Sequence, residues 1–451
     1  MKTIEHKDAG LIPEDTLFDE VVEFLYEKEF ASIFDLQKKF RIGYSRAEKI
    51  LDRLSAAGII EYFENDQSLR FIGKEGWPKR LNKESWGRLW SGYYGKYNDL
   101  ARGFLKECWS DSKKENLILS PLSILMVLSM LAGATDGTTR DEVLSVIGDD
   151  CNYDAIKEIA KSLSDLAKDS RDLHSANAVC VKETISNTIR TEYVEDLKKT
   201  YSGELFSSSD MVKDVNRWIT EKTNGMIENV VGDDAKEMLA CIINAIAFES
   251  KWSEAYEEEQ IWDEDFTDIG RMKKRIPMLH STEEKYIENE LLTGFIKNYK
   301  RCEYSFMGLL PKKSGASQIG KCIKEIDFTD TFSSAQDCDV EVTIPEFSYK
   351  NKLDLSDYCK IMGIEKAFSR NADFSPMSSE WLKVEKIIHS ARIELDRCGT
   401  KAAAATVTEV FAGCALSLWE RKMVKLDRPF IYAIMYNETK IPVFIGVVNH
   451  I

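Results

Sequence analysis

One stretch near the C-terminus, GTKAAAATVTEVFAGCALSL at residues 399 to 418, restricts the fold more than any other part of the chain. As a strand, residues 400 to 410 would carry Lys401 and Glu409 on one face and only small or β-branched uncharged side chains on the other. Such a segment suits insertion between two existing strands, where an ionised side chain would be costly to bury. Gly399, which starts the stretch, can serve as a hinge.

An alanine-rich helix is the alternative for the same residues, because consecutive alanines are the best helix formers available. Against a helix, Thr406, Val407 and Thr408 are β-branched, and Gly399 and Gly413 flank the run. The pattern therefore favours a strand that is exposed at first and inserted later.

The segment GTKAAAAT also resembles the hinge of the serpins, whose pattern is Gly-Thr-acidic-Ala-Ala-Ala-Ala-Thr. The resemblance assigns the hinge to Gly399, Thr400, Lys401, Ala402, Ala403, Ala404, Ala405 and Thr406. Further motifs stand in the order of that family: NLILSPLSILMVLSMLAGATDGTTRDEV, NAIAFESKW, VTIPEFSYK, LKVEKIIHSARIEL and DRPFIYAIMYNETKIPVFIGVV. The similarity covers about residues 85 to 451, and it implies an α+β fold of helices and three β-sheets with an exposed reactive loop.

The composition restricts the class of protein. A chain of 451 residues with 43% hydrophobic residues can bury a large core, and its net charge of -15 argues against nucleic-acid affinity over the whole surface. The N-terminus has no apolar run of signal-peptide length, and no uncharged stretch of membrane-spanning length occurs. We therefore expect a cytoplasmic protein without a membrane partner.

The cysteines give no sign of a metal site or of a disulfide framework. Ten cysteines are scattered along the chain, and no two are closer than 16 positions. That spacing lacks the Cys-x-x-Cys pairs of zinc or redox sites, so we expect reduced thiols, no metal and no cofactor.

Residues 14 to 72 read as three helices followed by a β-hairpin, which is the winged-helix order. The third helix has Ala47, Ile50 and Leu51 on its apolar stripe. The runs IIEYF and LRFIG flank ENDQS and predict the hairpin. This unit is similar to the gamma domain of bacterial FtsK-type DNA translocases, which implies binding to duplex DNA or to a protein partner.

The predicted DNA-binding residues lie on and just before the third helix. Residues 38 to 53 hold six basic and two acidic side chains, a local charge of +4 in an acidic protein. Charged runs of this kind usually form a solvent-exposed helix face, but the winged-helix order favours DNA binding by these residues. The predicted set is Arg41, Tyr44, Arg46, Lys49 and Arg53.

The linker between the two parts is predicted from the composition of residues 73 to 83, GKEGWPKRLNK, which contain two glycines, one proline and four basic residues. We expect a winged-helix domain at residues 1 to 75, a linker at 76 to 84 and a serpin domain at 85 to 451.

The serpin resemblance implies roles for five further residues. Ser120, Ser123, Asn244 and His389 match the "shutter", a polar cluster under the central sheet, and Trp252 matches the "breach", where insertion starts. On the ordinary reading, Ser120 before Pro121 is a helix cap and a lone histidine in an apolar strand is a satisfied core residue. Neither reading requires catalysis.

We expect no enzymatic activity. None of the five histidines lies in a HExxH, GxSxG or cysteine-protease signature, and no glycine-rich phosphate loop is visible. No catalytic residue is assigned, and a hydrolase is the weak alternative.

The resemblance implies a suicide-substrate mechanism in which a protease cleaves the loop and is trapped as its acyl-enzyme when the loop inserts. Counting from Gly399 places the reactive bond at Gly413–Cys414, with Phe411, Ala412, Ala415 and Leu416 as neighbouring anchors. Small and apolar residues suit elastase-, subtilisin- or chymotrypsin-like serine proteases. A papain-like cysteine protease is an alternative target.

Two features depart from the serpin pattern. Arg397 stands where the family usually has glutamate, which predicts a weaker contact at the top of its strand, and Lys401 replaces the usual acidic residue after the hinge threonine. We expect a monomeric inhibitor with an N-terminal DNA- or partner-binding module. A non-inhibitory serpin acting as a DNA-linked regulator or protease sensor is the alternative.

Overall fold

The computed structural model describes residues 21, 24, 30–42, 47, 49–51, 60–63, 68–71, 93–111, 115–148, 153–223, 225–226, 228–236, 238–400 and 422–451. The chain divides into two compact units, Met1–Asn82 and Lys83–Ile451.

The smaller unit contains a helix and a three-stranded antiparallel sheet. The helix is α2 (Ile33–Phe40), and the strands β1 (Phe30–Ser32), β2 (Ile60–Phe63) and β3 (Ser68–Phe71) are ordered β1-β3-β2. The strands β2 and β3 form the hairpin that the sequence predicts. Ala47, Ile50 and Leu51, on the predicted stripe of the third helix, are buried. The winged-helix assignment itself stays a prediction.

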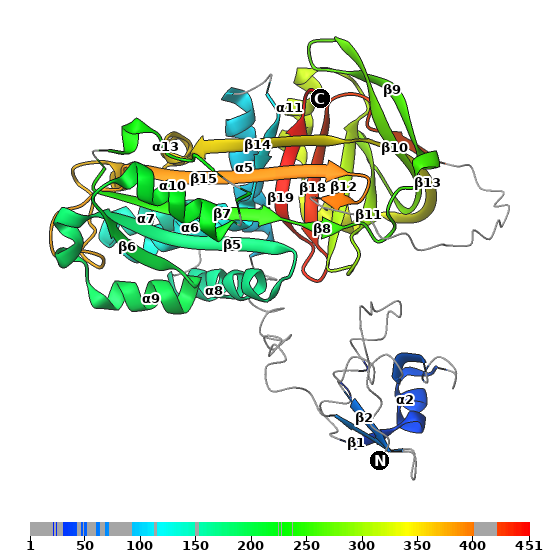
Figure 1. The fold of residues 1–451 in the computed structure, drawn as a ribbon, viewed down its shortest axis with the longest axis horizontal. Helices are drawn as coiled ribbons and strands as arrows, with labels where there is room; N and C mark the ends of the chain where they lie inside the picture. Colours follow the sequence, from blue (N-terminus) through cyan, green and yellow to red (C-terminus); the bar gives the residue numbers. More distant parts are fainter. Residues whose placement is uncertain are drawn as a thin grey trace. The chain divides into compact units, whose positions relative to one another are not determined.

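Most helices of the larger unit lie in its left half in Figure 1. The helices of this unit are α5 (Tyr94–Asp111), α6 (Pro121–Ala134), α7 (Gly137–Ile147), α8 (Tyr153–Asp169), α9 (Thr191–Tyr201), α10 (Met211–Lys222), α11 (Ala316–Glu325), α12 (Phe328–Ser333) and α13 (Ser356–Met362). Helix α6 begins at Pro121 after the N-cap Ser120, whose side chain accepts the backbone N–H of Ser123. Nearly every residue of α6 is buried, as expected of a central helix that is hydrophobic all round.

A nine-stranded sheet makes one half of the larger unit. Its path is β17 (Lys422–Lys425), β13 (Gln336–Pro345), β10 (Lys273–Glu288), β11 (Leu292–Asn298), β12 (Tyr304–Pro311), β18 (Phe430–Tyr436), β19 (Ile441–Val448) and β4 (Leu117–Leu119), and β9 (Ile261–Thr267) pairs with β10. Strands β18 and β19 are buried almost throughout, which explains why their sequences read as continuous apolar runs.

A seven-stranded sheet makes the other half. Its path is β6 (Glu204–Ser208), β5 (Leu173–Lys182), β7 (Ala240–Phe248), β15 (Lys386–Asp396), β16 (Gly399–Thr400) and β8 (Ser250–Lys251), and β14 (Phe347–Asp354) pairs with β15. In Figure 1 the long strands β5, β7, β15 and β14 run side by side. The α+β class expected from the sequence is confirmed.

Hydrophobic clusters pack against both faces of the seven-stranded sheet. The main core joins α6 and the nine-stranded sheet to one face, which carries Ile387, Ala391 and Ile393 of β15. A smaller cluster packs α10 against the other face, where Ile388 lies. Alternate residues of β15 therefore face two different environments, as the two-residue period of a strand requires.

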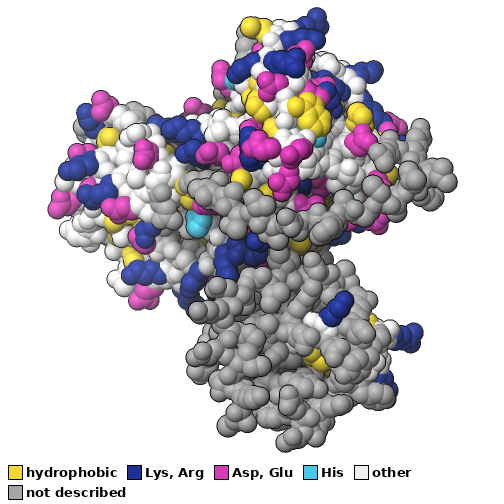
Figure 2. Space-filling view, turned by 45° about the vertical axis from the view of Figure 1, so that its right-hand side comes forward, with side chains coloured by type: hydrophobic (Ala, Val, Ile, Leu, Met, Phe, Trp, Pro, Cys, Tyr) yellow, Lys and Arg dark blue, Asp and Glu magenta, His cyan; other side chains and the backbone are white. Residues whose placement is uncertain are grey.

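On the face drawn in Figure 2, Lys and Arg side chains of the larger unit are interspersed with Asp and Glu, and neither sign dominates. Among the described residues, no helix is long and apolar enough to cross a membrane.

Candidate functional site

The central feature of the seven-stranded sheet is a parallel seam between β7 and β15. These strands lie more than 130 positions apart in the sequence, yet they pair directly from Lys386–Cys241 to Arg392–Ala247. Just at the end of this ladder lies a small hollow of about 10 Å³, lined by Met226, Ala247, Phe248, Arg392 and Glu394. The direct pairing of β7 with β15 therefore ends at Arg392 and Ala247.

A buried polar network lies beneath the seam. His389 and Asn244 are direct partners across β15 and β7. The backbone N–H of Ser120 donates to His389 Nε2 at 3.2 Å, and Ser123 Oγ lies 3.2 Å from His389 Nδ1. Ser123 Oγ also donates to Asn244 Oδ1. Helix α6 therefore contacts both strands of the seam through its first turn.

The network fixes the protonation of the histidine. Because a backbone N–H can only donate, Nε2 must accept, so the ring proton is on Nδ1 and points to Ser123. His389 is only 1% exposed, and burial lowers its pKa to about 4. The ring is neutral near pH 7, and a second proton would face the Ser120 N–H.

Sequence reasoning missed two members of this network. Asn244 Nδ2 donates to Asn177 Oδ1 at 2.6 Å, and Asn177 Nδ2 donates to the carbonyl of Tyr201 at 2.8 Å. Asn177 is buried in β5 directly opposite Asn244. In the sequence, the one sign of Asn177 is an amide side chain within LHSANAVCVK, a run that is typical of a buried strand.

The predicted hinge begins as a short strand. Gly399 and Thr400 form β16, which pairs antiparallel with the end of β15 and with β8. A Cβ on Gly399 would lie 2.2 Å from the carbonyl oxygen of Ser250, and the φ of Gly399 is +153°. Only glycine fits this position without displacing the neighbouring strand.

Trp252 holds the hinge from the side. Its Nε1 donates to the carbonyl of Asp396 at 2.9 Å, and its backbone N–H donates to the carbonyl of Cys398 at 3.0 Å. Its ring stacks on Tyr299, with centroids 4.6 Å apart. The hydroxyl of Tyr299 lies 2.7 Å from Thr400 Oγ1. Trp252 and Tyr299 therefore make hydrogen bonds to both sides of the turn at residues 396 to 400.

A buried ion pair lies behind Trp252. Lys297 Nζ is 2.7 Å from Glu283 Oε1, and the Lys297 side chain is 3% exposed. The ammonium group also lies 4.7 Å from the ring centroid of Tyr256 and 5.5 Å from that of Trp252. Burial opposes the charge, but Tyr256 and Glu283 outweigh it and raise the pKa of Lys297. Lys297 stays charged and positions the indole ring.

The contact at Arg397 differs from the expectation. The sequence predicted a weakened contact at the top of β15, but Glu346 accepts from the Arg397 backbone N–H at 3.1 Å and lies 3.5 Å from its Nε. Arg397 Nη1 also pairs with Glu258 at 2.8 Å. The C-terminal end of β15 is therefore held by contacts of Arg397 with Glu346 and Glu258. The sequence could not predict these contacts, because both glutamates lie far from Arg397 along the chain.

The structure thus brings Ser120, Ser123, Asn244 and His389 together and places Trp252 beside the hinge, as its contacts with residues 396 to 398 show. Several predicted residues lie outside the described part of the chain: Lys401, Ala402, Ala403, Ala404, Ala405, Thr406, Phe411, Ala412, Gly413, Cys414, Ala415, Leu416, Tyr44, Arg46 and Arg53. Arg41 and Lys49 are described, and both are exposed. In the described ranges, no group of three His, Cys, Asp or Glu could hold a metal ion.

Comparisons with known proteins agree with this arrangement. A family model described as "Serpin (serine protease inhibitor)" matches residues 95–451, and one described as "Ftsk gamma domain" matches residues 13–68. A serpin-like protein of Thermococcus kodakarensis is 28% identical over 343 residues, which cover 73% of this chain and 80% of the relative. A serine protease inhibitor of Cyanea capillata is 28% identical and covers 77% of this chain and 96% of the relative.

Solved structures show the same fold. The native state of the thermophilic serpin Tengpin superposes with a TM-score of 0.73 at 29% identity, covering 80% of this chain and 94% of that chain. Its latent state gives a TM-score of 0.65 at 28% identity, covering 79% and 98%. The serpin fold expected from the sequence is therefore confirmed, and the family model matches it over residues 95–451.

Proposed function

Because the chain belongs to the serpin family, we propose that it inhibits serine proteases by offering residues 401 to 421 as a substrate and then inserting that segment between β7 and β15. The observation that carries the proposal is the parallel seam with a glycine hinge already paired at its end. A strand inserted there would run antiparallel to both neighbours, because it follows β15 through a tight turn. One parallel contact would be replaced by two antiparallel ones, which are more stable per residue.

The register that β16 has started predicts how the segment would insert. Thr400 lies opposite Leu395, so continuing the pairing places Ala402, Ala404 and Thr406 opposite Ile393, Ala391 and His389. These three residues of β15 face the main core or the polar network beneath it. The small, uncharged face of the segment would therefore be the buried one.

The opposite face also matches its surroundings. In the same register Lys401 would lie opposite Glu394, and Glu409 would lie opposite Lys386, both partly exposed residues of β15. Val407 would lie opposite Ile388, which packs under α10. Both charges of the segment would thus meet opposite charges, which stabilises cross-strand pairs.

Insertion would remove a bound protease from its site of attack. Fourteen positions separate Gly399 from Gly413, so the acylated residue would move by roughly 45 Å at the usual strand rise. Tension on the acyl linkage would disorder the oxyanion hole and make hydrolysis too slow to release the enzyme. The uninserted form is then a metastable state whose lifetime is kinetic.

The target class is proposed from the segment itself. No Lys or Arg occurs between Glu409 and Glu420, and the bond Gly413–Cys414 is surrounded by small and apolar residues. Elastase-, subtilisin- and chymotrypsin-like pockets accept such residues, and trypsin-like pockets do not.

The test is incubation of the full chain with pancreatic elastase, subtilisin, chymotrypsin, trypsin and papain, followed by a denaturing gel and mass spectrometry of the released C-terminal peptide. We expect a covalent complex with at least one of the first three enzymes and a cut near Gly413. If every enzyme that cuts the segment turns over freely, the chain is a substrate or a protease sensor and not an inhibitor.

For the N-terminal unit we propose binding to duplex DNA, supported by the match of residues 13–68 to the gamma-domain model and by the basic residues 38 to 53. The test is a mobility shift at low salt with wild type and an Arg46→Glu, Arg53→Glu variant, because phosphate contacts weaken steeply with salt. Loss of the shift in the variant supports DNA binding. No shift of the wild type favours a protein partner.

A further inference from the structure

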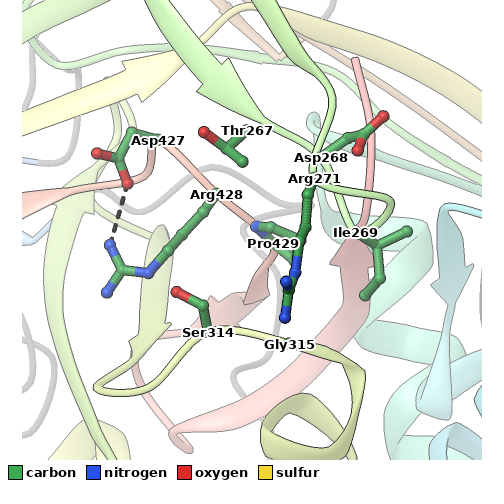
Figure 3. A pocket seen from close by; sticks show the side chains of 9 residues that line it. All are labelled: Thr267, Asp268, Ile269, Arg271, Ser314, Gly315, Asp427, Arg428 and Pro429. Carbon is green, nitrogen blue, oxygen red and sulfur yellow. Dashed lines mark hydrogen bonds and ion pairs between the residues drawn. The ribbon is translucent and has the colours of Figure 1, made fainter.

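A cavity of about 260 Å³ lies outside the insertion site, between three segments that are far apart in the sequence. The turn between β9 and β10 contributes Thr267 and Arg271, the loop before α11 contributes Ser314, and the segment after β17 contributes Arg428. In the view of Figure 3, Ser314 lies between the guanidinium groups of Arg271 and Arg428.

Arg271 is held toward the cavity by a fixed turn. Its backbone N–H donates to the carbonyl of Asp268 at 3.0 Å, and Ile269 N–H donates to the carbonyl of Asn449 at 2.9 Å. Arg271 has a φ of +69°, an uncommon conformation for a residue with a side chain. Its guanidinium makes no hydrogen bond or ion pair with any residue that the structure describes.

Arg428 is fixed on the other side of the cavity. Its Nη1 pairs with Asp427 at 3.0 Å, and its Nη2 donates to the carbonyl of Pro311 at 3.1 Å. Two bonds therefore preset the plane of this guanidinium before any ligand arrives, which reduces the entropy lost on binding.

The charged residues that line the cavity are two arginines and two aspartates, and only Arg428 and Asp427 form an ion pair with each other. The carboxylate of Asp427 is occupied by Arg428, and that of Asp268 accepts the backbone N–H of Met272 at 2.8 Å. In Figure 3 the Asp268 carboxylate points away from the other side chains. The positive charge of Arg271 is thus left without a described counterion, beside the hydroxyl donors of Thr267 and Ser314.

We propose that this cavity binds a phosphate group between Arg271 and Arg428. Guanidinium forks match the geometry of phosphate oxygens and form charge-assisted hydrogen bonds with them. The loop before α11 adds backbone N–H groups, since Gly315 precedes that helix and no described side chain caps it. The cavity is smaller than the roughly 300–1,000 Å³ of sites that enclose drug-sized ligands, so the ligand is inorganic phosphate or a small phosphate monoester.

The segments around the cavity already share a hydrogen bond, from the backbone N–H of Thr267 to the carbonyl of Asp427 at 2.8 Å, and a bound phosphate would add a second link. Residues 427 to 429 follow β17, and β17 follows residues 401 to 421, the segment that we propose as the substrate of the protease. A phosphate bridge from Arg428 to Arg271 stabilises the state in which β17 is anchored, because a ligand stabilises the form that binds it.

The test is isothermal titration calorimetry, which measures the Kd of the full chain for inorganic phosphate at constant ionic strength. The titration is repeated with glycerol 3-phosphate. The variant Arg271→Ala should raise the Kd by about tenfold or more, whereas Arg275→Ala should change it by less than about twofold. Arg275 is the matched control, because it is an exposed arginine of β10 that does not line the cavity. The tighter of the two ligands identifies the source of the phosphate group.

Two results would overturn the proposal. One is the absence of saturable binding of either ligand to the wild-type chain at millimolar concentration. The other is equal weakening by Arg271→Ala and Arg275→Ala, which would show attraction by surface charge alone. Neither result bears on protease inhibition, which the gel assay tests separately.

Discussion

His389 is the residue on which the closed seam depends most. It is buried, neutral and bonded through both ring nitrogens, one to the backbone N–H of Ser120 before α6 and one to the Ser123 hydroxyl. A buried polar network of this kind is stabilising only while every member is satisfied. The stability of the pairing between β7 and β15 should therefore depend on whether His389 Nε2 is protonated.

The first prediction concerns pH. The folded-state pKa of His389 is about 4 and its ordinary value is 6.5, so the unfolded chain binds more protons between these values. The unfolding free energy should fall as pH drops from about 6.5 to about 4, by up to about 3 kcal/mol. Urea unfolding of wild type and His389→Gln at pH 7 and pH 4.5 measures it.

The comparison with the variant isolates the histidine from other titrating groups. We expect His389→Gln to be less stable than wild type by about 2–3 kcal/mol at pH 7 and by less than about 1 kcal/mol at pH 4.5. A stability difference that does not change with pH would contradict the assignment.

Gly399 gives a second prediction at the residue scale. Gly399→Ala should destabilise the native state by about 2 kcal/mol or more, because the new Cβ would approach Ser250 O to 2.2 Å and the φ of +153° is unfavourable. The midpoint of thermal unfolding measures the effect. Gly95→Ala is the control, since a Cβ there meets nothing within 4 Å in α5 and should raise stability slightly.

At the scale of elements, the proposed insertion depends on how residues 401 to 421 would pair with β15. Continuing the register begun by β16, as we propose, would place Lys401 opposite Glu394 and Glu409 opposite Lys386. Cross-strand charge pairs contribute roughly 0.2–1 kcal/mol each, which is enough to change the rate of a step that competes with hydrolysis.

The third prediction reverses one of these charges. Glu394→Lys should slow insertion, so that more inhibitor is cleaved for each protease trapped, by about two- to fivefold. The stoichiometry of inhibition measures this ratio. Adding Lys401→Glu to Glu394→Lys should restore the wild-type ratio, and a double variant that stays impaired would contradict the register.

Some of this architecture could be predicted from local sequence and some could not. The helix after Ser120 and Pro121, and the hairpin near residue 65, follow from caps and apolar alternation that act within a few residues. The pairing of β7 with β15 could not, because nothing local in a parallel strand specifies a partner more than 130 positions away. Asn177, Lys297 and Glu346 were missed for the same reason, since their importance comes from tertiary neighbours.

At the scale of the whole molecule, two compact units share one chain. Among the described residues, the two hydrophobic clusters on the faces of the seven-stranded sheet begin at Tyr93. The seam between β7 and β15 therefore belongs to the larger unit, and the DNA binding that we propose for the smaller unit is a separate function.

The fourth prediction follows from this division. Charge reversal in the smaller unit, by Arg41→Glu together with Lys49→Glu at two exposed positions, should leave the rate of protease inhibition unchanged within about twofold in the absence of DNA. The rate constant for complex formation measures it. A larger change would show that the smaller unit takes part in inhibition itself.

The measurement that tests the central claim most directly is a crystal structure of the chain after cleavage within residues 401 to 421. We expect a new strand between β7 and β15, antiparallel to both, with Thr406 opposite His389. A cleaved chain in which Asn244 and His389 are still direct partners across a parallel seam would contradict it.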